Sequence, residues 1–85
     1  MMNIVNTITT GIMRTELGNG TFVSTVLFDN GVYETMVFDN ENNMEELDCY
    51  RTSEYAEAFE MHMAFVREYL NKAEIEEQEG GKQGV

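Results

Sequence analysis

The chain has a single cysteine and no long hydrophobic run, and each shortage excludes a class of protein. Cys49 is the only cysteine among 85 residues, so no disulfide can form within the chain, and nothing indicates secretion. No apolar run is long enough to span a bilayer, and residues 1–20 lack the basic start and apolar stretch of a signal peptide. We therefore expect a cytoplasmic protein.

Basic residues are also scarce. The chain has 5 of them against 16 acidic residues, which gives a net charge of −11. Such a field repels phosphate backbones and anionic membranes, so we expect neither nucleic-acid binding nor membrane binding. The same field attracts a basic protein surface, although solubility is the ordinary role of a net charge of this sign and size.

Motifs for catalysis and metal binding are missing as well. His62 is the only histidine, and Cys49 is the one nucleophile that could pair with it, without a third orienting group or an oxyanion site. The segment DNENNMEE (39–46) superficially resembles a calcium loop, but Met44 replaces the glycine and Tyr50 the bidentate glutamate of an EF-hand. One histidine and one cysteine cannot form a structural zinc site. We therefore expect no enzyme, no metal and no cofactor.

The chain does contain enough apolar material to fold, with 42% hydrophobic and 11% aromatic residues. A domain of this length buries only about 60–65% of its unfolded surface, so self-association is a natural supplement to its core. We predict one domain over residues 1–78. The end of the chain, EIEEQEGGKQGV, has no apolar pattern and predicts a disordered tail over residues 79–85.

The stretch VSTVLFDNGVYETMVF (Val23–Phe38) is typical of a β-hairpin. Asn30-Gly31 predicts a two-residue type I′ turn, which would pair Val26 with Thr35. Neither face of this hairpin is cleanly polar. A sheet face that is exposed to water normally carries polar residues, so this pattern indicates that both faces of the hairpin are covered.

Further strand signals flank the hairpin. Gly18-Asn19-Gly20 predicts a turn that folds residues 12–17 back onto the first hairpin strand, and Leu47–Thr52 predicts a short last strand. Residues 3–10 alternate β-branched residues and form either a strand or an arm. The expected fold is α+β: a small antiparallel meander of about three or four strands packed against one long C-terminal helix.

That helix is predicted from Tyr55 to about residue 76, with Ser53 as its N-cap and no proline or glycine inside. Its apolar side chains cover an arc of roughly 200°, although packing on one sheet face needs about half as much. The excess surface, which includes Met61, Met63 and Phe65, predicts a homo-oligomer.

Four motifs carry a family resemblance: VSTV (Val23–Val26), YETMVF (Tyr33–Phe38), LDCYR (Leu47–Arg51) and S-x-x-x-E-A-x-x-x-H (Ser53–His62). They occur in the same order in a family of small, mostly uncharacterised bacteriophage proteins, which this chain resembles over about residues 22–70. The family's longer loop between the first two motifs is replaced here by the DNG turn. The family's glycine directly before the helix histidine is replaced here by Met61. The resemblance implies a phage origin and an α+β fold, and it brings no known activity.

Small acidic phage accessory proteins often inhibit host proteins, including defence components, so the resemblance suggests such a role. We predict a non-enzymatic, homo-oligomeric inhibitor that binds a host protein in the host cytoplasm. The alternatives are an oligomeric sponge for a nucleotide immune signal and a minor virion or assembly component. The candidate partner-binding residues are Glu41, Glu45, Glu46, Asp48, Met61, Met63 and Phe65.

Three further residues are candidate ligand contacts: Glu34, Arg51 and His62. Each also has a structural interpretation. His62 would be a buried or interfacial residue bonded to a backbone carbonyl or a carboxylate. Glu34 would be solvated or paired with Arg14 or Arg51.

Overall fold

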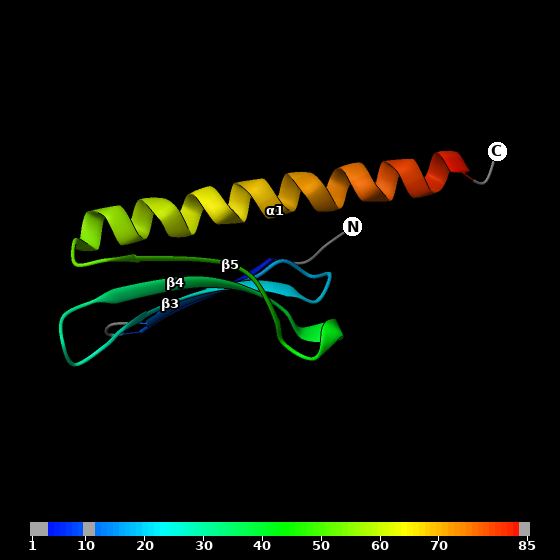
Figure 1. Cartoon of the computed structure of the whole chain (residues 1–85). Coiled ribbons are helices and arrows are strands. Elements are labelled where there is room, and N and C mark those ends of the chain that lie inside the picture. The colour runs from blue at the N-terminus through cyan, green and yellow to red at the C-terminus, as the bar shows by residue number, and fades with distance from the viewer. Residues whose placement is uncertain (1–3, 10–11, 84–85) are drawn as a thin grey trace.

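A computed structural model describes residues 4–9 and 12–83, which form one antiparallel sheet and one long helix (Figure 1). The elements are β1 (Val5–Thr9), β2 (Ile12–Glu16), β3 (Thr21–Leu27), β4 (Tyr33–Asp39), the 3₁₀ turn η1 (Asn40–Asn42), β5 (Glu45–Thr52) and α1 (Tyr55–Gln83). Each strand pairs with the next one in the chain, and α1 crosses one face of the sheet. The predicted α+β meander is confirmed, and it has five strands because Val5–Thr9 is a strand rather than an arm.

The turn between β2 and β3 forms where the sequence predicts it. The amide of Leu17 donates to the carbonyl of Thr21 at 3.0 Å and closes the loop. Gly18 and Gly20 have φ angles of 84° and 93°, in the left-handed region that glycine adopts without a steric penalty. The glycines therefore allow β2 to fold back on β3.

The turn between β3 and β4 is longer than predicted. The amide of Gly31 donates to the carbonyl of Phe28 at 2.9 Å, and the amide of Phe28 donates to the carbonyl of Val32, also at 2.9 Å. Gly31 has a φ of 83°, but Asn30 is not among the residues with positive φ. A type I′ turn needs positive φ at both central residues, so the predicted two-residue turn is wrong.

This longer loop shifts the hairpin register by one residue. Thr25 pairs with Thr35, and Val26 pairs with Glu34, whereas the two-residue turn would have paired Val26 with Thr35. Because side chains alternate between the two faces of a sheet, the shift places Thr25 and Thr35 on the same face. That face lies under α1, where both threonines are buried.

The hydrophobic core lies between this face and α1. Its buried centre consists of Leu17, Val23, Val37, Phe65 and Val66. Leu47, Tyr50, Met61, Tyr69 and Leu70 pack around that centre and are partly buried. β5 has an irregularity opposite Val37 and Phe38, where Leu47 has no register partner. Such a bulge re-aims neighbouring side chains, which accounts for Leu47 reaching the core.

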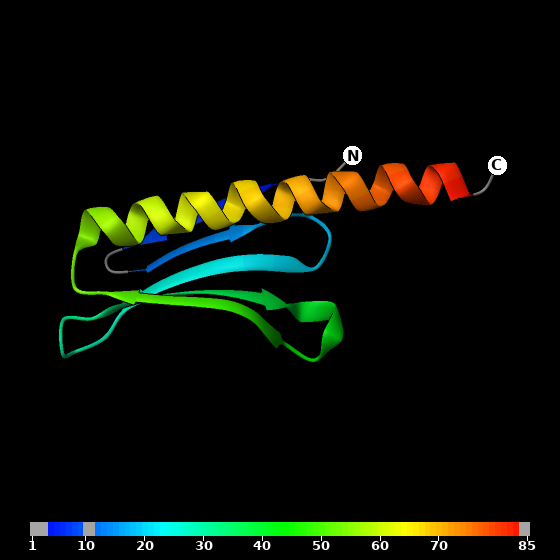
Figure 2. The same ribbon diagram turned by 45° about the horizontal axis from the view of Figure 1, so that its top comes forward.

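Helix α1 begins at Tyr55, as predicted, but it ends later than predicted. The carbonyl of Glu54 accepts the first helical bond from the amide of Ala58 at 3.0 Å, so Glu54 rather than Ser53 occupies the N-cap position. The helix continues to Gln83 and projects past the sheet (Figures 1 and 2). Residues 79–83 of the disordered tail predicted over 79–85 belong to this helix, and residues 84–85 lie outside the part of the chain that the structure describes. The glutamates, glutamines and lysine of this segment are good helix formers, and no proline interrupts them.

Candidate interaction surfaces

A buried histidine joins α1 to three strands through threonine hydroxyls. His62 is 0% exposed; its Nε2 lies 2.8 Å from Oγ1 of Thr15, and its Nδ1 lies 2.7 Å from Oγ1 of Thr25. The Thr25 hydroxyl also lies 2.7 Å from that of Thr35. A hydroxyl both donates and accepts, so a neutral imidazole satisfies both ring nitrogens here without any charge. Burial accordingly lowers the pKa of His62 to about 4.

The prediction that His62 contacts a ligand is therefore wrong. Its ring is closed off by the sheet, and both nitrogens are bonded within the fold. The structural interpretation holds, although the bonding partners are hydroxyls rather than a carbonyl or a carboxylate. Cys49 lies on β5, and burial raises the pKa of its thiol, which disfavours the reactive thiolate. The structure thus forms no Cys–His pair.

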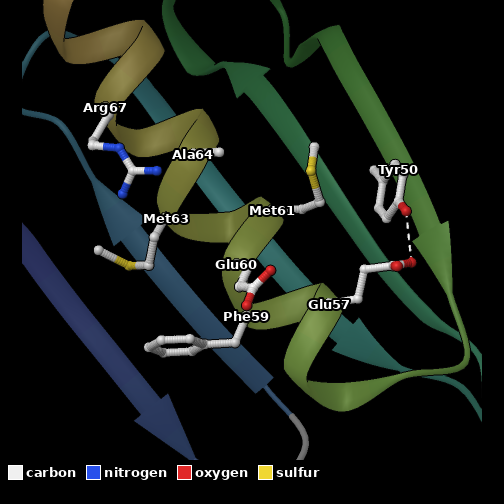
Figure 3. A pocket seen from close by; sticks show the side chains of 8 residues that line it. All are labelled: Tyr50, Glu57, Phe59, Glu60, Met61, Met63, Ala64 and Arg67. Atoms are coloured by element: carbon white, nitrogen blue, oxygen red, sulfur yellow. Dashed lines mark hydrogen bonds between the residues drawn. The ribbon is translucent and has the colours of Figure 1, made fainter.

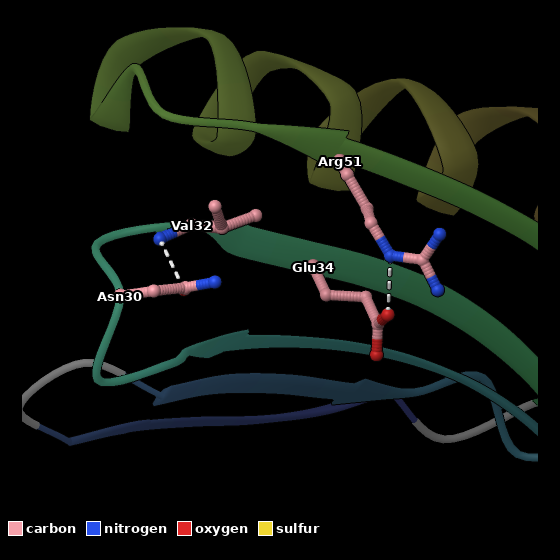
Figure 4. A network of polar contacts seen from close by, with 4 residues as sticks. All are labelled: Asn30, Val32, Glu34 and Arg51. Atoms are coloured by element: carbon pink, nitrogen blue, oxygen red, sulfur yellow. Dashed lines mark hydrogen bonds and ion pairs between the residues drawn. The ribbon is translucent and has the colours of Figure 1, made fainter.

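Glu34 and Arg51 form an ion pair across β4 and β5 (Figure 4). Oε2 of Glu34 accepts from Nε of Arg51 at 2.7 Å, and this bond raises the pKa of Arg51. The side chain of Arg51 is 65% exposed, whereas that of Glu34 is 13% exposed. The two predicted ligand contacts therefore engage each other, as the structural interpretation of Glu34 expected.

The sheet face that carries this pair faces away from α1, and we call it the open sheet face. It carries Arg14, Phe22, Ser24, Val26, Glu34, Met36 and Phe38. The rings of Phe22 and Phe38 lie 5.3 Å apart, and the guanidinium of Arg14 lies 3.9 Å from the centre of the Phe22 ring. A hollow of about 190 Å³ lies among Ser24, Val26, Glu34, Met36 and Phe38. In the part of the chain that the structure describes, no helix covers this face (Figure 1).

Of the four acidic residues that were predicted to bind a partner, three have exposed carboxylates and one has a carboxylate that is bonded within the chain. Glu41, Glu45 and Glu46 are exposed. Asp48 is half-buried, and its Oδ2 accepts from the Tyr69 hydroxyl at 3.3 Å, so it is not free to bind a partner. Burial first, and then the charge of Asp48, raises the pKa of Tyr69.

Two of the exposed carboxylates lie at one end of the open sheet face. Glu46 pairs with Phe38 in the register of β4 and β5. Glu41 lies against Gly20, directly before β3, where an added Cβ would be 2.5 Å from its Cγ. Glu16 pairs with Phe22 and adds a third carboxylate. The apolar centre of the open sheet face is therefore bordered by negative charge.

The three apolar residues on α1 that were predicted to bind a partner also differ in their exposure. Phe65 is 6% exposed and belongs to the core, so its assignment as a partner-binding residue is wrong. Met61 and Met63 are half-buried. The sequence could not distinguish these residues, because the width of an apolar arc does not say which part of it faces the sheet.

A surface depression of about 640 Å³ lies along α1 beside β5 (Figure 3). It is lined by Tyr50, Glu57, Phe59, Glu60, Met61, Met63, Ala64 and Arg67. The Tyr50 hydroxyl donates to Oε1 of Glu57 at 2.6 Å and ties β5 to the first turns of the helix. Phe59 is 43% exposed, which is unusual for so large an apolar side chain on a helix that already covers a sheet.

Comparison with known proteins adds no relative: no protein-family model, no curated protein and no solved structure matches the chain. Among residues 4–9 and 12–83, no group of three metal-binding side chains comes together, and no helix is both long and apolar enough to cross a membrane. The structure therefore presents two surfaces that could contact another molecule: an apolar sheet face with an acidic border, and the amphipathic outer side of α1.

Proposed function

We propose that the chain is a non-enzymatic phage accessory protein, a homo-oligomer that inhibits a host defence-system protein by binding to it. The observation that carries the proposal is the open sheet face. A folded sheet that buries one face under a helix normally presents polar residues on its other face. This sheet instead presents Val26, Met36 and Phe38 around a hollow of about 190 Å³. Such a surface is typical of an interface centre.

The charges indicate what kind of partner fits. Glu16, Glu41 and Glu46 border one end of the open sheet face, and the whole chain carries a net charge of −11. A host protein with an apolar patch flanked by lysine or arginine would match both features. Its long-range attraction to the chain would also speed association at low ionic strength.

Three of the basic residues, Arg14, Arg51 and Lys72, are already paired with carboxylates, which favours a protein partner over a nucleotide and leaves Arg67 as the exception. Arg51 lies 2.7 Å from Glu34, Arg14 lies 3.8 Å from Glu16, and Lys72 lies 3.2 Å from Glu68. A nucleotide phosphate would have to displace a carboxylate from each of these cations. A sponge for a nucleotide immune signal is therefore the weaker alternative.

The test is capture from host extract with purified chain, followed by calorimetry with the captured protein. Wild type should retain one host protein at a fixed ratio, and Met36→Glu should lose it because the substitution places a charge at the apolar centre. Ile75→Glu is the matched control, since Ile75 is 45% exposed on α1, which covers the opposite face of the sheet. Equal binding by both variants would refute the assignment of the open sheet face. Recovery of the chain from purified phage particles would instead support a virion component.

A further inference from the structure

The outer side of α1 carries a charge pattern that is complementary to itself. Glu60 and Arg67 are seven residues apart, which places them two turns apart on one side of the helix, and both are exposed. Met63 and the small Ala64 lie between them, and all four line the depression of about 640 Å³ (Figure 3). We call these four residues the outer helix face.

Arg67 differs from the three other basic residues among residues 13–75, whose side chains the structure describes. Arg14, Arg51 and Lys72 each pair with a carboxylate of their own chain, whereas Arg67 pairs with none among those residues. Glu60 likewise has no ion pair among residues 13–75. In a protein of net charge −11, an exposed cation one helical turn from Met63 is an attractive position for a carboxylate from outside.

We propose that this carboxylate is Glu60 of a second copy, and that the outer helix faces of two chains pack antiparallel. A two-fold axis between Met63 and Ala64 brings each Arg67 opposite the other copy's Glu60, so one ion pair forms twice. Residues 55–72 of the two helices would then lie alongside each other over about 27 Å. The inference rests on the homo-oligomeric part of the proposed function and specifies its interface.

Two features favour the antiparallel arrangement. A parallel, in-register pair would place Glu60 against Glu60 and Arg67 against Arg67, which is repulsive at both ends. Ala64 at the crossing point allows close approach, while Phe59 and Met63 gain apolar contact. The dimer would stack sheet, helix, helix and sheet, and both open sheet faces would remain free for a host protein (Figure 1).

Charge reversal tests the proposal by sedimentation equilibrium and light scattering over a range of concentrations. Wild type should be a dimer. Arg67→Glu and Glu60→Arg should each raise the dimer Kd by about tenfold or more, because each turns two attractive pairs into two repulsive ones. The double variant Glu60→Arg/Arg67→Glu should restore the wild-type Kd to within about threefold, because it only exchanges the partners.

Matched controls change the net charge equally away from the outer helix face. Arg14→Glu, on the open sheet face, matches Arg67→Glu, and Asp29→Arg, on the exposed β3–β4 turn, matches Glu60→Arg. Both controls should leave the Kd unchanged. A monomeric wild type, an oligomer indifferent to both single reversals, or a double variant as weak as the single ones would each overturn the proposal. Capture of a host protein by the open sheet face is measured in a separate experiment. A monomeric chain that still captures a host protein would refute the dimer alone, and a dimer that captures none would refute the proposed inhibitor alone.

Discussion

Replacing Thr25 by valine tests whether the hydroxyl network under α1 holds the sheet and the helix together. Valine keeps nearly the same shape but removes the hydroxyl that lies 2.7 Å from both Nδ1 of His62 and Oγ1 of Thr35. Each of those buried atoms would lose a partner, and leaving a buried polar group unsatisfied costs about 1–3 kcal/mol. We therefore expect Thr25→Val, which leaves two such atoms, to lower the free energy of unfolding by about 2–6 kcal/mol. A domain of this size has roughly 4–13 kcal/mol in total.

The assay is urea unfolding followed by circular dichroism, with the midpoint and the slope both fitted. Thr21→Val is the matched control, because Thr21 begins the same strand with a half-buried side chain outside the network. It should change the free energy of unfolding by less than about 0.5 kcal/mol. If Thr25→Val costs no more than this control, the network contributes nothing to stability and our reasoning about it is refuted.

Three further predictions concern pH, the exposed ion pair and the turns. The pKa of His62 is lowered from 6.5 to about 4 in the folded state, so the stability that it confers is complete above pH 6.5 and is lost as the pH falls through about 4. That loss is about 3 kcal/mol, and His62→Gln should lack this acid-dependent component in unfolding curves taken between pH 7 and pH 3.5. Arg51→Gln should cost at most about 1 kcal/mol, and less in high salt, because the ion pair is largely solvated; a larger loss in thermal unfolding would contradict this. Gly20→Ala and Gly31→Ala should each cost about 1 kcal/mol for their positive φ, with Gly20→Ala slightly worse because its Cβ crowds Glu41; equal stability to wild type would refute the assigned turn geometry.

The sequence was sufficient to predict the elements but not the register of the hairpin. The Gly18–Gly20 turn and the amphipathic run after Ser53 each encode one local structure, and both were predicted correctly, whereas the β-branched residues before Thr10 had left a strand and an arm open. Asp29-Asn30-Gly31 is compatible with two turns, a two-residue type I′ turn and a longer one with a single positive φ at glycine. Composition alone does not separate them, and the choice between them decides whether Thr25 faces Thr35.

The candidate sites show the same limit. His62 was visible as the only histidine, but its burial depends on threonines from three different strands, whose approach is a long-range property of the sheet. Phe65 and Met63 lie on one apolar arc, and only the helix orientation makes the first a core residue and the second half-exposed. The apolar character of the open sheet face was predicted, because neither face of the hairpin was cleanly polar, but the cover that this pattern indicated on both faces is present on only one in the described part of the chain.

The most direct test of the account is the mass of the chain in solution, measured by light scattering with and without a panel of linear and cyclic nucleotides, together with its melting temperature. We expect a dimer, with twice the 9.7 kDa mass of one chain, whose melting temperature no nucleotide changes. A nucleotide at a hundredfold excess over its Kd would stabilise the native state by about 2.7 kcal/mol, which is a shift of roughly 10 °C or more in a domain of this size. Such a shift would contradict a protein-binding inhibitor and establish a sponge, and a monomer at every concentration would contradict the homo-oligomer.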